Sequence, residues 1–300
     1  MRGNSHARFL GGRERATARA YPVRQAPMQL WLINLWRILS DWLRAALNNA
    51  QAVRRSRMLP AWLAVTGIAI DFGLMGLWFR YTEQSWGRQW MVSCGLMFLV
   101  RLATVSAILV WVCRRYQIPV AALGLRPSTM RADFQWSFRI CALTVLVTTA
   151  TIVAGLAAAF GLGMRLPEPP GSFVQFLGGG VRECIVMAGI GVTGNMLVVV
   201  TEELIYRSLF LPPLTCSLGL YPAVAVTAIV FGLAHVIPFG RLGIPVPEII
   251  GGVLMAGGFA IRWSVIPAMV IHAMGNLFAG ALVLTYVQLF RACPTLFLGQ

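Results

Sequence analysis

Seven ionisable side chains lie within apolar stretches of this 300-residue sequence, where a charge is costly and therefore indicates function. They are Asp71, Arg101, Glu202, Glu203, Arg207, His235 and His272. The chain has only 3 histidines, so two of them stand in apolar surroundings. Carboxylates and imidazoles transfer protons near neutral pH, and such a set could activate a water molecule for hydrolysis.

The first candidate motif is Glu202-Glu203-x-x-x-Arg207. Neighbouring residues point about 100° apart on a helix, so the two glutamates are not expected to face the same partner. Glu203 precedes Arg207 by four residues, the favourable order for an ion pair within one helix. Glu202 is therefore expected to point elsewhere. The alternative is that both carboxylates lie at a helix end on the membrane surface.

Two further motifs each place a histidine four residues from a second side chain, on one face of a helix. They are Phe231-x-x-x-His235 and His272-x-x-x-Asn276. Taken alone, each motif favours helix packing, because polar side chains often join helices within a membrane. Their depth changes this interpretation. By helical rise, Glu202 and His272 lie roughly 14 Å below the cytoplasmic surface, and His235 lies about 20 Å from the start of its segment. We therefore expect these residues and Asn276 to line one polar cavity.

In this order, the three motifs resemble those of the CPBP family of intramembrane proteases. That family includes the type II CAAX prenyl endopeptidases and bacterial bacteriocin-processing and self-immunity proteins. The resemblance covers residues 140–290 and leaves residues 1–60 outside it. One departure is Ser208, which follows Arg207 where the family usually has glycine.

The resemblance implies that four side chains carry out the reaction. Glu202 and His235 would activate a water molecule for attack on a peptide bond, and His272 and Asn276 would stabilise the oxyanion. Three further residues would support the site: Glu203, Arg207 and Phe231. The expected function is thus that of an intramembrane endopeptidase with a water-filled cavity, where a peptide can leave its helical structure.

Metal dependence has two interpretations. Members of the family are often labelled metalloproteases, and Glu202, His235 and His272 would form a zinc set. However, the sequence has no HExxH motif, and Asn276 is a poor zinc ligand. The 6 cysteines include no CxxC pair and are interpreted as packing residues. A metal-free mechanism without a cofactor is favoured, with zinc as the alternative.

Composition places these motifs in a membrane. Hydrophobic residues make up 58% of the chain, charged residues 12%, and the mean hydropathy is +0.72. Soluble domains carry about 25% charged residues, so a soluble protein is excluded. The net charge of +15 comes from arginine without any lysine. We interpret it as positive charge on the cytoplasmic side, and no nucleic-acid partner is expected because no basic stripe is interleaved with exposed aromatics.

The predicted fold is an all-α polytopic membrane protein with about seven transmembrane helices, since each span needs about 20 apolar residues. The candidate spans are residues 61–79, 90–112, 140–164, 185–211, 222–237, 247–261 and 264–290.

Polar residues recur every three or four positions between 28 and 50. This pattern predicts an N-terminal amphipathic helix lying flat in the membrane interface, with an eighth span as the alternative.

The chain is expected to have five parts. They are a disordered Arg-rich arm (1–27), an interfacial helix with a basic anchor (28–58), two spans with a cytoplasmic loop (59–139), the CPBP-like catalytic core (140–290) and a C-terminal tail (291–300). Residues 1–60 carry eleven arginines and the 113–139 loop carries five, whereas the alternate loops carry two each. The N-terminus of this multi-pass protein is therefore expected in the cytoplasm, with the spans in the inner membrane.

Asp71 and Arg101 lie at the same depth in the first two predicted spans, about 16 Å from one membrane surface by helical rise. Because a short loop joins these spans, the two charges are expected to pair. One alternative is that Arg101 turns toward Glu203. The other is that each charge lies in its own water pocket.

Two other functions stay open from the sequence. A transporter or channel would also bury charges along its pathway, although no internal repeat pairs the two halves of the chain. A non-catalytic membrane immunity or scaffold protein would carry the same motifs without a reaction. The expected partners are a peptide or membrane-protein substrate and the lipid bilayer.

Overall fold

The computed structural model describes residues 27–56, 60–82, 88–162, 164, 181–236 and 243–294. The chain splits into two compact units, Met1–Asp41 and Trp42–Gln300. The predicted arm at 1–27, apart from Pro27, and the end of the tail lie outside the described residues. Every element in the described ranges is helical and none is a strand, which confirms the all-α prediction.

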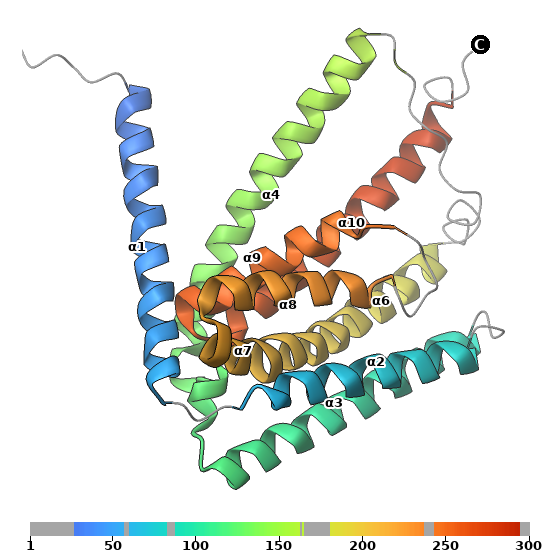
Figure 1. Cartoon of the computed structure of the whole chain (residues 1–300). Helices are drawn as coiled ribbons and strands as arrows, with labels where there is room; N and C mark the ends of the chain where they lie inside the picture. The colour runs from blue at the N-terminus through green and yellow to red at the C-terminus, as the bar shows by residue number, and fades with distance from the viewer. Residues whose placement is uncertain are drawn as a thin grey trace, which may run out of the picture. The chain divides into compact units, whose positions relative to one another are not determined.

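The described part of the chain consists of helices, most of them long (Figure 1). The α-helices are α1 (Pro27–Ser56), α2 (Trp62–Thr82), α3 (Arg88–Tyr116), α4 (Met130–Gly161), α6 (Val181–Glu203), α7 (Leu211–Leu218), α8 (Leu220–Ala234), α9 (Val246–Arg262) and α10 (Val265–Ala292). Two 3₁₀ turns, η1 (Val120–Leu123) and η2 (Pro127–Thr129), precede α4, and a π-helical turn, η3 (Leu204–Phe210), joins α6 to α7.

Three helical stretches among the described residues are long and apolar enough to cross a membrane. They are Gly95–Tyr116, Pro127–Ala159 and Val265–Ala292. They coincide with three of the predicted spans, and two shorter apolar helices, Trp62–Trp78 and Leu220–Ala234, coincide with two more. A polytopic membrane protein is therefore supported, whereas the count of seven spans is not confirmed.

The predicted loop at 113–139 is too long. Helix α4 begins at Met130, directly after the 3₁₀ turn that starts at Pro127. The hydroxyl of Thr129 donates to the Asp133 carboxylate at 2.6 Å and so closes the first turn of α4. Arginine is a good helix former, so Arg131 fits the first turn of α4.

The predicted span at 185–211 does not end where expected. Helix α6 passes into η3 at Leu204, and α7 then continues to Leu218. Pro212 is accepted because the first turn of a helix needs no donor from its own N–H. All residues of η3 are buried, and this turn carries Arg207 of the first motif. Single π-helical turns are frequent at functional sites, because the wider turn re-aims the side chains.

Helices α8 and α9 approach each other through glycines. A Cβ atom at Gly252 would lie 2.9 Å from Ala228 Cα, and one at Gly232 would lie 2.6 Å from Ile249 Cγ1. Only glycine allows such contact, and small residues at helix interfaces are common in membranes. The α9 backbone at Gly252 is thereby brought to the side chain of Arg207, which donates to its carbonyl at 3.3 Å.

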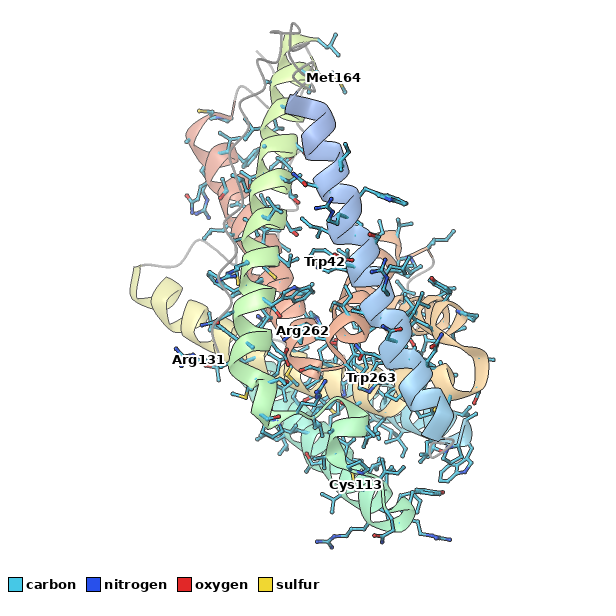
Figure 2. The ribbon with its side chains drawn as sticks, turned by 90° about the vertical axis from the view of Figure 1, so that its left-hand side faces the viewer. Trp42, Cys113, Arg131, Met164, Arg262 and Trp263 are labelled. Carbon is cyan, nitrogen blue, oxygen red and sulfur yellow. The ribbon has the colours of Figure 1, made fainter. Side chains whose placement is uncertain are left out.

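The turn from α9 to α10, where Figure 2 labels Arg262 and Trp263, is fixed by contacts with η1 and with the first turn of α4. Trp263 has a left-handed backbone with φ of 47°, and its indole N–H donates to the carbonyl of Ala122 at 3.1 Å. Arg262 pairs with Asp133 at 2.7 Å. The predicted spans 247–261 and 264–290 leave only these two residues between them, and the very tight turn that this spacing predicts is confirmed. It fixes the start of α10, the helix that carries His272.

Helix α1 confirms the helix predicted at residues 28–50 and extends it to Ser56. Within residues 27–41, Trp36 is 74% exposed, and Leu39 is exposed on the same helix. Within the second unit, the side-chain amide of Asn49 donates to the carbonyls of Ala260 and Ile261 at 3.1 and 3.0 Å. Exposed apolar residues on an amphipathic helix suit a membrane surface, and the flat orientation stays a prediction.

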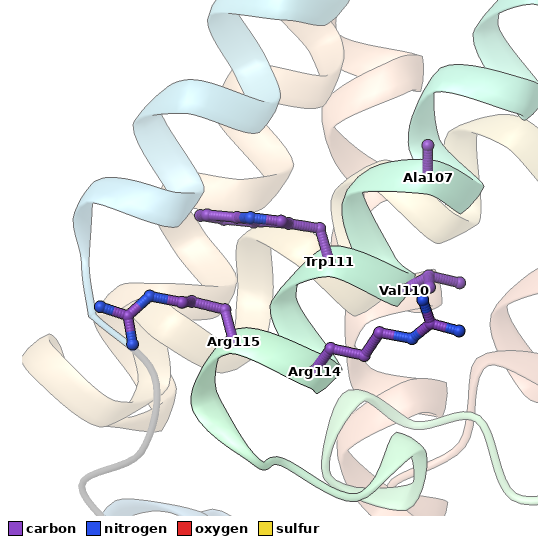
Figure 3. A pocket seen from close by; sticks show the side chains of 5 residues that line it. All are labelled: Ala107, Val110, Trp111, Arg114 and Arg115. Atoms are coloured by element: carbon purple, nitrogen blue, oxygen red, sulfur yellow. The ribbon is translucent and has the colours of Figure 1, made fainter.

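The C-terminal turn of α3 has the composition of a membrane interface. The ring of Trp111 lies 6.1 Å from the rings of both Trp62 and Tyr116. Arg114 and Arg115 follow Trp111 and line an open groove with it (Figure 3). Aromatic rings and arginines gather where spans leave the hydrocarbon layer. We therefore expect this end of α3 at one membrane surface.

Candidate active site

Six ionisable side chains are buried next to one another among α2, α3, α6, η3 and α10. They are Asp71, Arg101, Glu202, Glu203, Arg207 and His272, each no more than 8% exposed. Charges removed from water must pair with one another, since an isolated buried charge is very costly. His235, the seventh residue of the predicted set, is half-buried at the end of α8.

Asp71 on α2 and Arg101 on α3 form a buried ion pair. Arg101 Nε donates to Asp71 Oδ1 at 2.9 Å, and Nη2 donates to the same oxygen. The second oxygen of Asp71 accepts the hydroxyl of Tyr206 at 3.1 Å. The predicted pair is confirmed, and the alternative of two separate water pockets is wrong.

Arg101 also lies beside the first motif. Its Nη1 is 3.8 Å from Glu202 Oε1, so the neighbouring carboxylate is that of Glu202 and not the predicted alternative, Glu203. The distance permits electrostatic attraction but exceeds that of a hydrogen bond. Among the buried side-chain atoms of the described residues, Arg101 Nη1 and Glu202 Oε2 have no hydrogen-bond partner. Buried polar atoms usually have a partner, which makes this pair a suitable place for a water molecule.

His272 contacts both glutamates, which corrects the expectation that they face different partners. Its Nδ1 lies 2.8 Å from Glu203 Oε1, and its Nε2 lies 3.8 Å from Glu202 Oε2. The two ring nitrogens point in different directions, so one imidazole reaches two adjacent carboxylates that diverge from the helix. Glu203 also pairs with Arg207 at 3.0 Å, which confirms the predicted ion pair within the helix.

The ring of Phe231 packs among the other side chains of the site. Its centroid lies 4.6 Å from the His235 ring and 5.6 Å from the His272 ring. The guanidinium of Arg207 lies 4.9 Å from the Phe231 centroid, within the range of a cation–π interaction. The Tyr206 ring lies 5.2 Å away in an edge-on arrangement. Phe231 thus joins two motif histidines and the motif arginine through its faces and edges.

His235 presents one ring nitrogen to the backbone. Its Nδ1 lies 2.8 Å from the carbonyl of Phe231, which fixes the ring and leaves Nε2 for chemistry. No contact recorded for the described residues joins His235 directly to Glu202 or to His272. The shared cavity predicted for the four catalytic candidates therefore stays a prediction.

Asn276 pairs with a residue that the sequence analysis missed. Its amide donates to the side-chain oxygen of Asn195 on α6 at 2.7 Å, and Asn195 in turn donates to the carbonyl of Ala273 at 3.4 Å. Asn276 is exposed, one turn beyond the buried His272. Asn195 lies seven residues before Glu202, about two turns of one helix, and that spacing was the available signal.

A metal ion shared by the predicted zinc set does not fit this arrangement. The described residues contain no group of three or more His, Cys, Asp or Glu side chains that could hold a metal ion. Glu202 and His272 lie close together, whereas the recorded contacts of His235 are with the backbone and ring of Phe231. Ser208, the departure from the family pattern, is fully buried within η3.

Comparison with known families identifies the part of the chain that carries the motifs. The family model described as type II CAAX prenyl endopeptidase, Rce1-like, matches residues 184–278. This segment is Rce1-like. It covers about a third of the chain and includes all three motifs, which confirms the family prediction for them. No curated protein and no solved structure was found to match the chain.

The Rce1-like segment supplies only part of the buried charge cluster. It contains Glu202, Glu203, Arg207 and His272, on α6, η3 and α10. The ion pair between α2 and α3 lies outside it. The match supports a CAAX-type endopeptidase acting on a peptide substrate in a membrane. A metalloprotease type has no support among the described residues.

Proposed function

We propose that this chain is an intramembrane endopeptidase that hydrolyses a peptide bond with a water molecule activated by Glu202. The supporting observation is the position of the Glu202 carboxylate. It is almost fully buried, lies 3.8 Å from both Arg101 and His272, and has one oxygen without a hydrogen-bond partner. A general base needs a free oxygen within reach of the water, and Glu202 Oε2 meets that condition.

In the proposed reaction, Glu202 takes one proton from the water while the water oxygen attacks the carbonyl carbon of the peptide. The C–N bond then breaks, and the proton passes to the leaving nitrogen. The products are a free carboxyl group and an amine. Half-buried His235, with Nε2 available, assists the proton transfer.

His272 stabilises the negative charge that develops on the carbonyl oxygen. We assign the Nδ1 hydrogen of His272 to its contact with Glu203 Oε1, so that the carboxylate pairs with a protonated imidazole. The Nε2–H of that imidazole can then donate to the oxyanion, together with the amide of Asn276. Arg207 keeps Glu203 in place through their ion pair.

The substrate is a peptide or a segment of a membrane protein. A bond can be cut only after the backbone around it becomes irregular, which the bilayer tolerates only at a polar cavity lined by protein. The scarcity of charged residues and the apolar helices indicate that the substrate reaches the site from within or beside the membrane. Peptide export, bacteriocin maturation and membrane-protein turnover would all supply such substrates.

The proposal is tested by comparing the peptides of cells that produce the wild type with those of cells that produce Glu202→Gln. Glu248→Gln, which removes a carboxylate from the first turn of α9, is the matched control. We expect a set of new N-termini in cells with the wild type and with Glu248→Gln, and their loss in cells with Glu202→Gln. Identical peptides in all three would favour the transporter or the non-catalytic scaffold.

A further inference from the structure

We propose that Arg101, held by Asp71, is a positioning residue for Glu202, so that α2 and α3 belong to the catalytic centre although they lie outside the Rce1-like segment. This inference rests on the proposed function. It assigns the α2–α3 ion pair a task in the reaction, beyond joining two helices.

Three contacts fix the Arg101 side chain, and a fourth fixes its partner, Asp71. Asp71 accepts hydrogen bonds from Nε and Nη2, and Tyr206 holds the second oxygen of Asp71. The guanidinium also lies 5.4 Å from the centroid of the Phe98 ring. Because the guanidinium is planar and rigid, fixing two of its nitrogens fixes the third. Nη1 is therefore directed to one place, and the nearest recorded carboxylate there is that of Glu202.

The distance between Arg101 and Glu202 suits a positioning role. At 3.8 Å the cation attracts the carboxylate without donating a hydrogen bond to it. A full two-bond contact would occupy both oxygens of Glu202 and leave none for a water molecule. Asp71 prevents that contact because it already occupies the fork of Arg101. Asp71 thus holds the cation close enough to attract the Glu202 carboxylate, and far enough to leave Oε2 free.

The charges of the cluster support the same interpretation. The cluster contains three carboxylates, those of Asp71, Glu202 and Glu203, and two arginines. Arg207 is engaged by Glu203 and by the carbonyl of Gly252, which leaves Arg101 for the other two carboxylates. Arg101 is therefore shared between two carboxylates. A protonated His272 would balance the remaining charge, and the proposed contact of its Nε2–H with the oxyanion requires that protonated form.

Kinetics on the purified protein in lipid vesicles separate positioning from folding. For Arg101→Met, we expect kcat to fall up to about 100-fold with KM within about twofold, because misplaced groups slow the chemical step. Arg101→Lys should recover part of kcat. Arg114→Met removes an exposed arginine from the same helix and should leave both constants unchanged.

A charge exchange gives a sharper distinction. Asp71→Arg combined with Arg101→Asp should recover the folded yield that Asp71→Arg alone loses, because the ion pair is restored. Activity should stay low, since a carboxylate then replaces the cation beside Glu202. Recovery of both folded yield and kcat would show that the pair only joins the helices, and would overturn the proposal.

A labelling experiment tests the inference without any peptidase activity. Dicyclohexylcarbodiimide reacts with protonated carboxyl groups, so its addition to Glu202 compares the state of that carboxyl group between the wild type and the Arg101 variant. By mass spectrometry at neutral pH, we expect several-fold more labelling of Glu202 in Arg101→Met than in the wild type and in Arg114→Met. Equal labelling of all three proteins would contradict the proposal. A wild type that is inactive yet shows the expected labelling would contradict only the proposed function.

Discussion

At the scale of single residues, the two polar side chains of the motif His272-x-x-x-Asn276 have different surroundings. His272 is buried between two carboxylates, whereas Asn276, one turn later on α10, is exposed and bonds to Asn195. The amide–amide bond fixes the orientation of Asn276. A donor that is already oriented costs no reorganisation when the oxyanion forms.

We therefore expect Asn276→Ala to lower kcat about 100- to 1,000-fold, the usual cost of removing one oxyanion donor. Asn195→Ala should lower kcat less, because Asn276 stays but loses its orientation. The measurement is steady-state cleavage in lipid vesicles. An unchanged kcat for Asn276→Ala would remove this residue from the proposed reaction.

At the scale of helices, the close contact of α8 with α9 positions the site. A Cβ atom at Gly252 would overlap Ala228, whereas one at Gly257 on the same helix would meet no heavy atom within 4 Å. This contact brings Phe231 on α8 and the Gly252 carbonyl on α9 to the guanidinium of Arg207. Separation of the two helices would release the motif arginine.

Gly252→Ala should therefore destabilise the protein by about 1–3 kcal/mol, the usual cost of overpacking. Gly257→Ala should be neutral or slightly stabilising, because alanine favours a helix more than glycine does. Thermal unfolding in detergent measures both variants. Equal melting temperatures would show that α8 and α9 do not pack as closely as the structure indicates.

Some elements could be predicted from sequence because local chemistry determines them. The turn at Trp263 and the ion pairs Glu203–Arg207 and Asp71–Arg101 follow from short spacings or from equal depth. The π-helical turn η3 could not be predicted, because its apolar residues fit an ordinary helix equally well. The contact of His272 with both Glu202 and Glu203 depends on how α10 packs against α6, which no local pattern gives. The same holds for Asn195, because its polarity alone does not indicate Asn276, 81 positions away, as its partner.

At the scale of the whole molecule, the buried charge cluster includes helices that lie outside the Rce1-like segment. The match covers residues 184–278, and the cluster extends to α2 and α3. The cytoplasmic position of the N-terminus and the number of spans stay predictions from the arginine distribution and hydropathy. Cysteine accessibility labelling on each side of the vesicle membrane would test both.

At the same scale, we also expect the protein to work without a metal ion. Chelation with 1,10-phenanthroline should leave the cleavage rate unchanged, since the described residues provide no shared metal site. The inactive isomer, 1,7-phenanthroline, controls for effects of the compound on the bilayer. Loss of activity with the chelator alone, restored by added zinc, would establish the alternative zinc set of Glu202, His235 and His272.

The most direct test of the account uses purified protein in lipid vesicles and a peptide whose cleavage in cells depends on Glu202. The reaction is run in H₂¹⁸O, and the products are analysed by mass spectrometry. We expect the wild type to place one ¹⁸O atom in each new carboxyl group, and Glu202→Gln to give no product above the background. Equal cleavage by Glu202→Gln, or an uncleaved peptide with folded wild type, would contradict the assignment of Glu202 as the base of an intramembrane endopeptidase.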